Sequence, residues 1–415
     1  MSVPTSSRAR AGTSVPATDS LIPWRVQCSV RMPARRCRGH AACCVSTADT
    51  DWEGAKTPMT TIETRIDEAK LQAFVGQAVV DMGAAISGLL LHIGDRLGLY
   101  KAMAGAGPMT SSTLAARTGT AERYVREWLG NQAAGGYVVY DAATGTFELP
   151  PEQAMVVANE DSPVFLAGAF ESIASCYADH DSFVDAFLTG AGIGWGEHDH
   201  RLFSGVLRLF RPGYAAYLVD ERLPALDGVV DKLRGGASVA DVGCGLGAST
   251  ILMAAAFERS TFVGIDIHAQ SIDGARRAAI AAGVEHRTSF EVATAKELSG
   301  SGYDLVCMFD CLHDMGDPVG AARRIREALA PDGTLLLVEP LAGDGVEQNL
   351  NPVSRAYYGL STVICTPASL SQEVGRALGA HAGERQLALT LREAGFSDVR
   401  RASHTPFNLI LEARP

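Results

Sequence analysis

Two clusters in the second half of the chain have residue types and spacings suited to chemistry. The first is a short apolar stretch that starts at Ala237 and ends in Gly243, Gly245 and Gly247, three glycines spaced two apart. Glycines let a backbone approach a ligand closely and adopt positive φ without strain. A helix is expected over Ala248–Phe257, so its first amides would face the crevice at the end of the strand. The turn is therefore predicted to bind a ligand.

The second cluster lies where an apolar stretch that starts at Tyr303 runs abruptly into Asp310, His313 and Asp314. Such groups at the end of a buried strand are costly unless they are solvated or used. Histidine suits proton removal near neutral pH because its unperturbed pKa is about 6.5. We therefore predict that His313 is a general base and that Asp314 or Asp310 orients its ring. The alternative is a histidine at a helix start that bonds only to the backbone.

Two acids indicate the ligand of the glycine turn. Asp266 ends the next expected strand, nineteen residues after Gly247, where it would bind the ribose hydroxyls of either NAD or S-adenosylmethionine (SAM). Gly243 also starts a G-x-G-x-x-A stretch that fits the dinucleotide pattern. Asp241, however, lies in the strand just before the turn. Its carboxylate would attract the ammonium group of SAM and repel a pyrophosphate, so SAM is favoured.

Alternating strands and helices must position these residues. A parallel sheet with helices on both faces is expected, followed by a terminal antiparallel pair, which makes an α/β fold with a seven-stranded, Rossmann-like sheet. After the glycine turn the expected strands are Thr261–Asp266, Thr288–Val292, Tyr303–Asp310, Thr334–Glu339, Asp398–Ser403 and Phe407–Ala413. Ligands of such sheets bind outside the carboxyl ends of the strands. One crevice should therefore collect Gly243–Gly247, Asp266-Ile267, Thr294-Ala295 and Phe309–Asp314.

The motif D-x-G-x-G-x-G that starts at Asp241, followed by VGID ending at Asp266, resembles class I SAM-dependent methyltransferases. That family often carries an acid near the adenine after its third strand, where this chain has Thr294 within ATA. An adenine contact there would have to come from a hydroxyl or the backbone. The resemblance and the strand ends together predict these cofactor-binding residues: Asp241, Gly243, Gly245, Gly247, Asp266, Ile267, Thr294, Ala295, Phe309 and Asp310.

The stretch around His313 resembles the LHD-W-x-D segment of small-molecule O-methyltransferases, in which the histidine is the general base. Here Met315-Gly316 stands in place of the usual tryptophan and its neighbour. The resemblance extends from Met59 to the C-terminus and is closest to bacterial winged-helix methyltransferases. It implies a winged-helix dimerisation module, a helical linker and a catalytic domain.

The N-terminal stretch, residues 1–58, differs in composition from the rest. It is rich in arginine, serine and proline and almost free of acids before Asp49, as a transit peptide is. A disordered extension, with Met59 opening the folded protein, is the preferred interpretation. The predicted domains are then 59–150, a winged-helix dimerisation domain; 151–236, a helical linker and pocket region; and 237–415, the SAM-binding domain with a lid insertion at 341–383.

Residues 110–150 read as two short helices and a β-hairpin, which is a winged helix. This fold often binds DNA, but DNA affinity depends on basic side chains that neutralise phosphates. Of the 36 basic and 47 acidic residues, eight and four lie before residue 59, which leaves a net charge of −15 after it. We predict no nucleic-acid partner.

From Ile62 to Met103 a helical pattern is apolar around much of its circumference. Because a small domain has little core in which to bury such a helix, a homodimer interface is expected. No run of about eighteen uncharged apolar residues occurs, so no membrane partner is predicted. The cysteines after residue 58 are scattered as in a reduced cytoplasmic protein.

Aromatic residues are candidates for the walls of an acceptor pocket. Trp195, Phe210 and Tyr214 flank helices that glycine and proline should interrupt, with a break expected near Pro212. Tyr357 and Tyr358 lie in the lid insertion. Lids at strand ends carry specificity, so these walls predict a hydrophobic or aromatic acceptor.

No metal site is predicted. Glu197-His198-Asp199-His200 has ligand-type residues but is more typical of a solvated loop, and Cys307 and Cys311 have no matched second pair. The sequence thus predicts a cytoplasmic, dimeric methyltransferase that uses SAM and acts on a small molecule at oxygen. The alternatives are a winged-helix regulator that senses SAM and an NAD(P)-dependent oxidoreductase.

Overall fold

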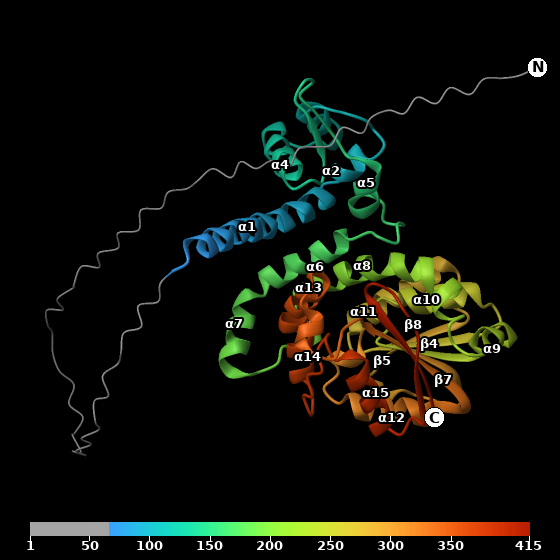
Figure 1. Ribbon diagram of the computed structural model, residues 1–415. Helices are drawn as coiled ribbons and strands as arrows, with labels where there is room; N and C mark the ends of the chain where they lie inside the picture. The colour runs from blue at the N-terminus through green and yellow to red at the C-terminus, as the bar shows by residue number, and fades with distance from the viewer. Residues whose placement is uncertain (1–65) are drawn as a thin grey trace, which may run out of the picture. The chain divides into compact units, whose positions relative to one another are not determined.

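The computed structural model describes residues 66–415, which form one compact unit, Ile66–Pro415. The extension predicted over residues 1–58 lies outside the described residues. The described part begins with helices and a small hairpin, continues through a helical layer, and ends in an α/β sheet (Figure 1).

A small domain of helices and one hairpin comes first. Its elements are α1 (Glu68–Arg96), α2 (Leu99–Met103), α3 (Ser111–Thr118), α4 (Glu122–Ala134), β1 (Val139–Asp141), β2 (Thr146–Glu148) and α5 (Pro151–Val157). The Thr110 side chain accepts from the amide of Thr113 and so caps α3, while Gly119 ends that helix with φ 66°. In the core, the Tyr100 hydroxyl donates to the Gln132 side chain at 2.6 Å. The predicted winged helix is confirmed.

A helical layer follows, made of α6 (Ala167–Ala178), α7 (His180–Thr189), α8 (Arg201–Tyr217) and α9 (Val229–Gly235). Helices α6 and α8 pack with their backbones in contact because both have a glycine at the crossing. A Cβ on Gly168 would lie only 2.6 Å from the Gly205 carbonyl oxygen. The helix break predicted near Pro212 is wrong. Helix α8 continues through this buried proline, and the irregular turn comes later, as a π-helix, η2, over Leu218–Arg222.

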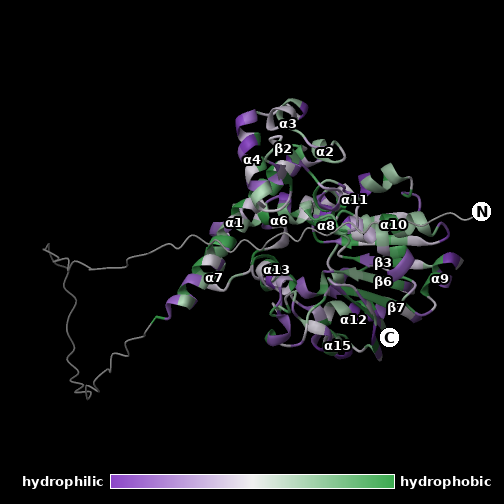
Figure 2. Ribbon diagram, turned by 45° about the horizontal axis from the view of Figure 1, so that its top comes forward, coloured by the Kyte–Doolittle hydropathy of each residue, from purple (hydrophilic) through white to green (hydrophobic). Residues whose placement is uncertain are grey.

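The catalytic half is a seven-stranded sheet of order β5-β4-β3-β6-β7-β9-β8. Its strands are β3 (Ser238–Val242), β4 (Thr261–Asp266), β5 (Thr288–Val292), β6 (Tyr303–Phe309), β7 (Leu329–Pro340), β8 (Asp398–His404) and β9 (Asn408–Arg414). The first five pair in parallel, and β9 pairs antiparallel with both β7 and β8. The central strands β3, β6 and β7 are strongly hydrophobic, as expected for strands covered on both faces (Figure 2). The predicted seven-stranded α/β fold is confirmed.

The crossover helices of the sheet are α10 (Ala248–Ala256), α11 (Ala269–Ala282), α12 (Pro318–Ala328) and α15 (Gly383–Glu393). Asp317 caps α12 by accepting from the amide of Gly320, as the Asp-Pro pair predicts. The insertion between β7 and α15 is helical, with α13 (Pro352–Leu360), the π-helix η6 (Ser361–Cys365) and α14 (Thr366–Leu370). The helical content expected for residues 341–383 is therefore present.

Helix α1 is the one long helix of the described chain that is apolar enough to cross a membrane by length and composition, although only 11% of its most apolar window is buried. The sequence has no run of about eighteen uncharged apolar residues, because Asp81 interrupts the run, and α1 is apolar enough only when a charge within the window is allowed. The C-terminal half of α1 packs within the unit, with Leu91 and His92 buried. Arg208 of α8 holds this end through Asp95 of α1, with Nη1 2.7 Å from the carboxylate.

Candidate active site

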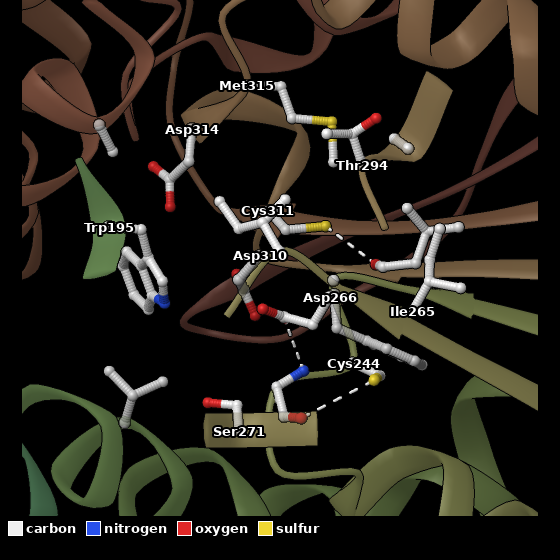
Figure 3. Close-up of a pocket in the computed structure, with 18 of the residues that line it drawn as sticks. Trp195, Cys244, Ile265, Asp266, Ser271, Thr294, Asp310, Cys311, Asp314 and Met315 are labelled. Atoms are coloured by element: carbon white, nitrogen blue, oxygen red, sulfur yellow. Dashed lines mark hydrogen bonds between the residues drawn. The ribbon is translucent and has the colours of Figure 1, made fainter. Parts of the chain in front are cut away.

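One cavity of about 500 Å³ lies at the carboxyl ends of β3, β4, β5 and β6. Its size is that of a small-molecule or cofactor site. Figure 3 shows Trp195 and Asp314 on one side of it and Ile265 and Thr294 on the other. The predicted site residues on its wall are Gly243, Gly245, Asp266, Ile267, Thr294, Ala295, Phe309, Asp310, Asp314, Trp195, Phe210 and Tyr214. Asp241, Gly247, His313, Tyr357 and Tyr358 are not on this wall.

The glycine turn has the geometry that its sequence predicts. Gly243, Gly245 and Gly247 all have positive φ, between 53° and 78°. A Cβ on Gly243 would lie 2.8 Å from the Cys311 sulfur, and one on Gly247 would lie 2.9 Å from Ala275. Gly245 alone has open space above it. The outer two glycines are therefore required for packing, while Gly245 presents bare backbone to the cavity.

Asp266 is held by two backbone amides. Its Oδ2 accepts from Gly245 at 2.9 Å, and its Oδ1 accepts from His268 at 2.8 Å. Burial raises the pKa of Asp266, although these amide hydrogen bonds oppose the shift. Each oxygen keeps a lone pair, so the carboxylate is oriented to accept hydroxyl groups on the cavity side. The turn and the acid after β4 thus form one hydrogen-bonded assembly.

The third strand end differs from its prediction in detail. The Thr294 hydroxyl donates to Glu297 at 2.9 Å, and its amide donates to the same carboxylate at 3.0 Å. This capping box commits both Thr294 donors to the protein. Close by, Lys296 and Asp317 also line the cavity and approach to 3.4 Å.

Asp310, at the end of β6, is a strained and incompletely bonded acid. Its φ is 50°, in the positive range that is uncommon outside glycine, although aspartate and asparagine adopt it more often than other residues do. Its Oδ1 accepts from the Asn408 side chain at 2.9 Å, whereas Oδ2 is buried with no hydrogen-bond partner among the described residues. Burial, with help from Glu339, raises the pKa of Asp310 to about 7. Strain and an unsatisfied oxygen on a cavity wall are typical of a group that meets a ligand.

Asp241 lies in β3 as expected, but its side chain is not on the cavity wall. Its carboxylate is 1% exposed and sits behind the wall, where Oδ2 accepts from the hydroxyls of Ser249 and Thr250, each at 2.6 Å. Burial raises the pKa of Asp241 to about 6. The side chain anchors the first turn of α10 to β3. Because that helix start carries the glycine turn, Asp241 acts on the cavity through the backbone.

His313 is buried between two carboxylates. Its Nδ1 is in short contact with Glu339 Oε2, and its Nε2 lies 3.1 Å from Asp314 Oδ1. Burial alone would lower the pKa of His313, but Asp314 and Glu339 outweigh it and raise that pKa well above the usual value. Asp314 lies on the cavity wall and His313 behind it. The backbone-only alternative for His313 is therefore wrong.

Glu339, near the end of β7, was missed by sequence reasoning. Its Oε1 accepts from the Leu312 amide at 2.9 Å, and the residue is 1% exposed. A buried carboxylate that bonds both the ring and the backbone of the same loop fixes the orientation of His313. The only sequence signal is an acid at the end of the fifth parallel strand, beside the strand that carries the histidine.

One face of α8 forms an apolar wall of the cavity. Phe210 and Tyr214 stack at 6.1 Å, as candidate wall residues should, and Trp195 meets Phe203 edge to face at 5.9 Å. Phe203, Val206 and Leu207 were missed by the sequence analysis, although they precede Phe210 at helical spacing. Extending the i, i+3, i+4, i+7 pattern backwards would have found them.

Tyr357 and Tyr358 of the lid do not line the cavity, contrary to prediction. The Tyr357 hydroxyl donates to the Phe407 carbonyl at 2.9 Å, and Tyr358 stacks on His381 at 3.5 Å. Tyr357 thus holds the lid to the rest of the domain, whereas Tyr358 packs within the lid. The lid residues that do reach the cavity are Ala368, Gln372 and Glu373. These follow the π-helix η6, whose irregular turn could not be placed from sequence.

Side chains of the loop before α8, residues 197–200, bind other side chains of the protein. His198 is buried, with Nδ1 3.1 Å from Asp179, and Asp199 binds Arg201 at 2.6 Å. The hydrogen bonds from the side chain and backbone of Arg201 hold the pKa of Asp199 at about 2, against burial, which would raise it. These contacts fix the start of α8 and hence the aromatic wall.

The cavity fits SAM by three of its own features. Gly245 offers bare backbone, Asp266 offers oriented carboxylate oxygens for ribose hydroxyls, and Asp310 offers an unpartnered carboxylate oxygen for an ammonium group. A pyrophosphate, by contrast, would be repelled by these carboxylates. Lys296 could neutralise it only in part, because that lysine already pairs with Asp317 and Glu373.

Comparison with known proteins agrees with this geometry. Residues 240–335 match the family model of a methyltransferase domain. The chain carries a methyltransferase domain. Residues 84–159 match the family model of an Rv2258c-like winged HTH domain. The methyltransferase match and the seven-stranded sheet together give the second half of the chain the class I SAM-dependent methyltransferase fold.

Two curated relatives each match about a third of the chain. One is dimethylglycine N-methyltransferase of Parasynechococcus marenigrum, 32% identical over 136 residues, which are 32% of this chain and 47% of that protein. The other is 27-O-demethylrifamycin SV methyltransferase of Amycolatopsis mediterranei, 32% identical over 137 residues, which are 32% of this chain and 50% of the relative. The chain thus spans about half the length of these relatives. One acts at nitrogen and the other, by its name, at oxygen.

Among solved structures, human N-acetylserotonin methyltransferase in complex with SAM is similar at a TM-score of 0.61 and 17% identity. The match covers 85% of this chain and 99% of that one. At this identity the likeness concerns the fold. It extends over the N-terminal helical domain as well as the methyltransferase domain, so the two parts share one architecture with a known enzyme.

Proposed function

We propose that this protein transfers the methyl group of SAM to the oxygen of a small, apolar or aromatic acceptor. The observation that carries the proposal is a single cavity that joins the glycine turn, Asp266 and Asp310 to the His313–Asp314 pair and to an aromatic wall. When bound, SAM supplies an electrophilic methyl group. The chain must then bind the cofactor, orient the acceptor and remove its proton.

Cofactor binding is assigned to the ends of β3, β4 and β6. Gly245 lets the ligand approach the backbone, Asp266 accepts the ribose hydroxyls, and the free oxygen of Asp310 accepts the ammonium group. Charged hydrogen bonds of this kind are about twice as strong as neutral ones. Asp310 thereby takes over the role that the sequence gave to Asp241.

Proton removal is assigned to His313. Because Glu339 holds Nδ1, Nε2 is the ring nitrogen that can take the acceptor proton, and it faces Asp314 at 3.1 Å. Asp314, on the cavity wall, has to turn aside for an acceptor hydroxyl to reach Nε2. The raised pKa of His313 means that this base becomes free only as the pH rises.

The acceptor is assigned to the space beneath Trp195, Phe203 and Phe210. These rings and Met315 give that side of the cavity an apolar surface, which fits a planar hydrophobic molecule better than a highly charged one. An acceptor bearing an amine is the second candidate, because one of the two curated relatives is an N-methyltransferase.

The decisive experiment is parallel calorimetric titration with S-adenosylhomocysteine, NADH and duplex DNA, followed by transfer of labelled methyl from SAM to panels of phenols and amines. We expect binding of the first ligand alone and labelling of phenols. Binding of NADH in its place would establish the oxidoreductase alternative. DNA binding with a steep salt dependence would establish the regulator alternative.

The winged helix is proposed to be structural. Arg123 and Arg126 of α4, the helix that would enter a DNA groove, pair with Glu127 at 2.5 Å and Glu122 at 2.7 Å. These exposed pairs leave no excess positive charge for phosphates on that helix.

Helix α1 is proposed to be the interface of a homodimer. Its exposed apolar side chains run along its length: Phe74, Val75, Val79, Val80, Met82, Ile86 and Leu89. An apolar surface of this length marks an association site. Light scattering after gel filtration should give a dimer, and Phe74→Glu with Met82→Glu should give a monomer. Co-sedimentation of the wild type with lipid vesicles would instead assign α1 to a membrane.

The cytoplasm is the proposed location. Cys176, Cys244, Cys307, Cys311 and Cys365 are all free thiols, as in a reducing compartment. Cell fractionation with an antibody against the native protein tests this, and recovery in a secreted fraction would contradict it.

A further inference from the structure

Beside the cavity, three side chains with metal-ligand atoms converge. His313 and Asp314 come from the short helix after β6, and Cys365 comes from the π-helix η6 of the lid. One nitrogen, one carboxylate oxygen and one sulfur from these residues lie within 4.8 Å of one another. No proton transfer in the proposed reaction uses Cys365.

The charges around this cluster favour a cation. The carboxylates of Asp314 and Glu339 flank the same imidazole, on Nε2 and Nδ1 respectively. Asp314 Oδ1 is buried and makes no hydrogen bond of good geometry with the described residues. A divalent ion between His313, Asp314 and Cys365 would satisfy that oxygen and neutralise the two carboxylates.

Glu339 gives the cluster the form of a metal site. In proteins, a histidine that binds metal through one ring nitrogen usually donates its other N–H to a carboxylate. Glu339 occupies this outer position at Nδ1, and the Leu312 amide fixes the carboxylate at 2.9 Å. Nε2 is thereby left to face Asp314 and Cys365, on the side where an ion would lie.

The donor set and the spacing indicate which metal. One nitrogen, one sulfur and one oxygen suit Zn²⁺, whose bonds of about 2.0–2.3 Å imply ligand separations of roughly 3.3–3.8 Å in a tetrahedron. The Nε2 to Oδ1 distance of 3.1 Å is slightly shorter than that range, and all three ligand atoms lie within 4.8 Å of one another, so side-chain rotations can bring them to the tetrahedral spacing. Asp314 also lines the cavity, so the fourth position faces solvent or acceptor.

We propose that His313, Asp314 and Cys365 bind Zn²⁺ and that the bound ion inhibits the enzyme. The inhibitory half rests on the proposed function, because an ion on Nε2 removes the lone pair that would take the acceptor proton. The ion also ties the lid, through Cys365, to the loop that carries the base. Metal binding and methyl transfer therefore compete for the same nitrogen.

Binding is tested first, without any activity assay. Chelator-treated protein is titrated with Co²⁺, whose thiolate complexes absorb in the near ultraviolet. We expect one ion per chain and a thiolate-to-cobalt band in the wild type. The band should be lost in Cys365→Ser and kept in Cys176→Ser, which removes a control thiol on α6 that donates to the Ser172 carbonyl.

A measurement on the unmodified protein guards against misfolding of the variant. X-ray absorption of the zinc-loaded wild type should show one sulfur ligand beside lighter nitrogen and oxygen ligands. A first shell without sulfur, or a Co²⁺ band that survives Cys365→Ser, would overturn the site. Calorimetry should further show that Cys365→Ser weakens Zn²⁺ binding at least tenfold.

Inhibition is tested by the ratio of methyl-transfer rates with and without Zn²⁺ in each variant. The wild type should lose activity in Zn²⁺ and recover it with a chelator, whereas Cys365→Ser should respond at least tenfold less. A rise in turnover with Zn²⁺ would overturn the inhibitory assignment. A protein that binds Co²⁺ through Cys365 but methylates no acceptor would refute the proposed function and leave the metal site intact.

Discussion

The ends of the neighbouring strands β3 and β6 each carry a buried acid, yet the two acids do different work. Asp241 bonds two hydroxyls of α10 and stands behind the wall of the cavity. Asp310 sits on left-handed backbone at the wall, with one oxygen unpartnered. Each acid keeps one buried oxygen without a hydrogen-bond partner among the described residues, so position explains the contrast: Asp310 lies on the cavity wall and Asp241 lies behind it.

A similar contrast separates the two carboxylates beside His313, the proposed base. Glu339 is fully engaged with His313 and Leu312, whereas Asp314 reaches the cavity. The end of β6 therefore brings its acids to the cavity wall, whereas the acid of β3 stays behind that wall. Substitutions at the two ends should accordingly affect activity at β6 and structure at β3.

The largest effect is expected from His313→Ala. If the end of β6 holds the base, turnover should fall about 10²–10⁴-fold, the usual contribution of general-base catalysis. Affinity for S-adenosylhomocysteine should stay within a factor of two, because His313 is not on the cavity wall. Single-turnover rates and calorimetry measure the two quantities. Undiminished turnover would move the chemistry to Asp314 or to a nitrogen acceptor.

Next in size is a matched pair of asparagine substitutions. Asp310→Asn should weaken S-adenosylhomocysteine by roughly tenfold or more, because it removes a charged hydrogen bond worth about 1.5–3 kcal/mol. Asp241→Asn should leave that affinity nearly unchanged, because the side chain contacts Ser249 and Thr250 and not the cavity. Calorimetry on both variants decides the comparison. The reverse pattern would restore the direct role that the sequence assigned to Asp241.

A smaller effect concerns stability at different pH values. The folded-state pKa of Asp310 is about 7, above its ordinary value of about 3.9, so the folded protein binds a proton there that the unfolded chain releases. This group favours folding below about pH 4 and loses that contribution as the pH rises through 7. Asp310→Asn, which mimics the neutral acid and tolerates positive φ, should therefore stabilise the protein at pH 8 by about 1–3 kcal/mol.

The same variant should give no gain at pH 4. Urea unfolding at both pH values is the measurement, and Asp241→Asn is the comparison, because its carboxyl pKa is raised less, to about 6, and predicts a smaller change of the same sign. Equal effects of Asp310→Asn on the free energy of unfolding at the two pH values would mean that ionisation of Asp310 does not destabilise the folded protein.

The smallest expected effect is a shift in a pH profile. Because Asp314 and Glu339 raise the pKa of His313, kcat/KM should increase with pH through a value above 6.5. Glu339→Gln removes one of the two charges, so the midpoint should move down by about one unit. A purely structural glutamate would lower the rate without moving the midpoint, and that outcome would remove Glu339 from the positioning of the ring.

The sequence predicted those features of the strand ends that depend only on a residue's type and on its immediate neighbours in the chain. Positive φ at Gly243, Gly245 and Gly247 follows from the residue type, and Asp266 follows from its place after an apolar strand. The order of strands and helices likewise follows from periodicity. The same rules found Phe210 and Tyr214, and the helical spacing continued backwards would also have placed Phe203 on the same wall.

The sequence by itself determined the class of fold, the glycine turn and the presence of a histidine and acids at a strand end, because these depend on residue type and short-range spacing. The tertiary structure alone decided which acids face the cavity. It placed Asp241 under two hydroxyls, brought Glu339 of β7 to His313 in the short helix that follows the neighbouring strand β6, and carried Cys365 to the same point. Contacts between strands and across the lid are set by packing over long sequence separations, which no local pattern records.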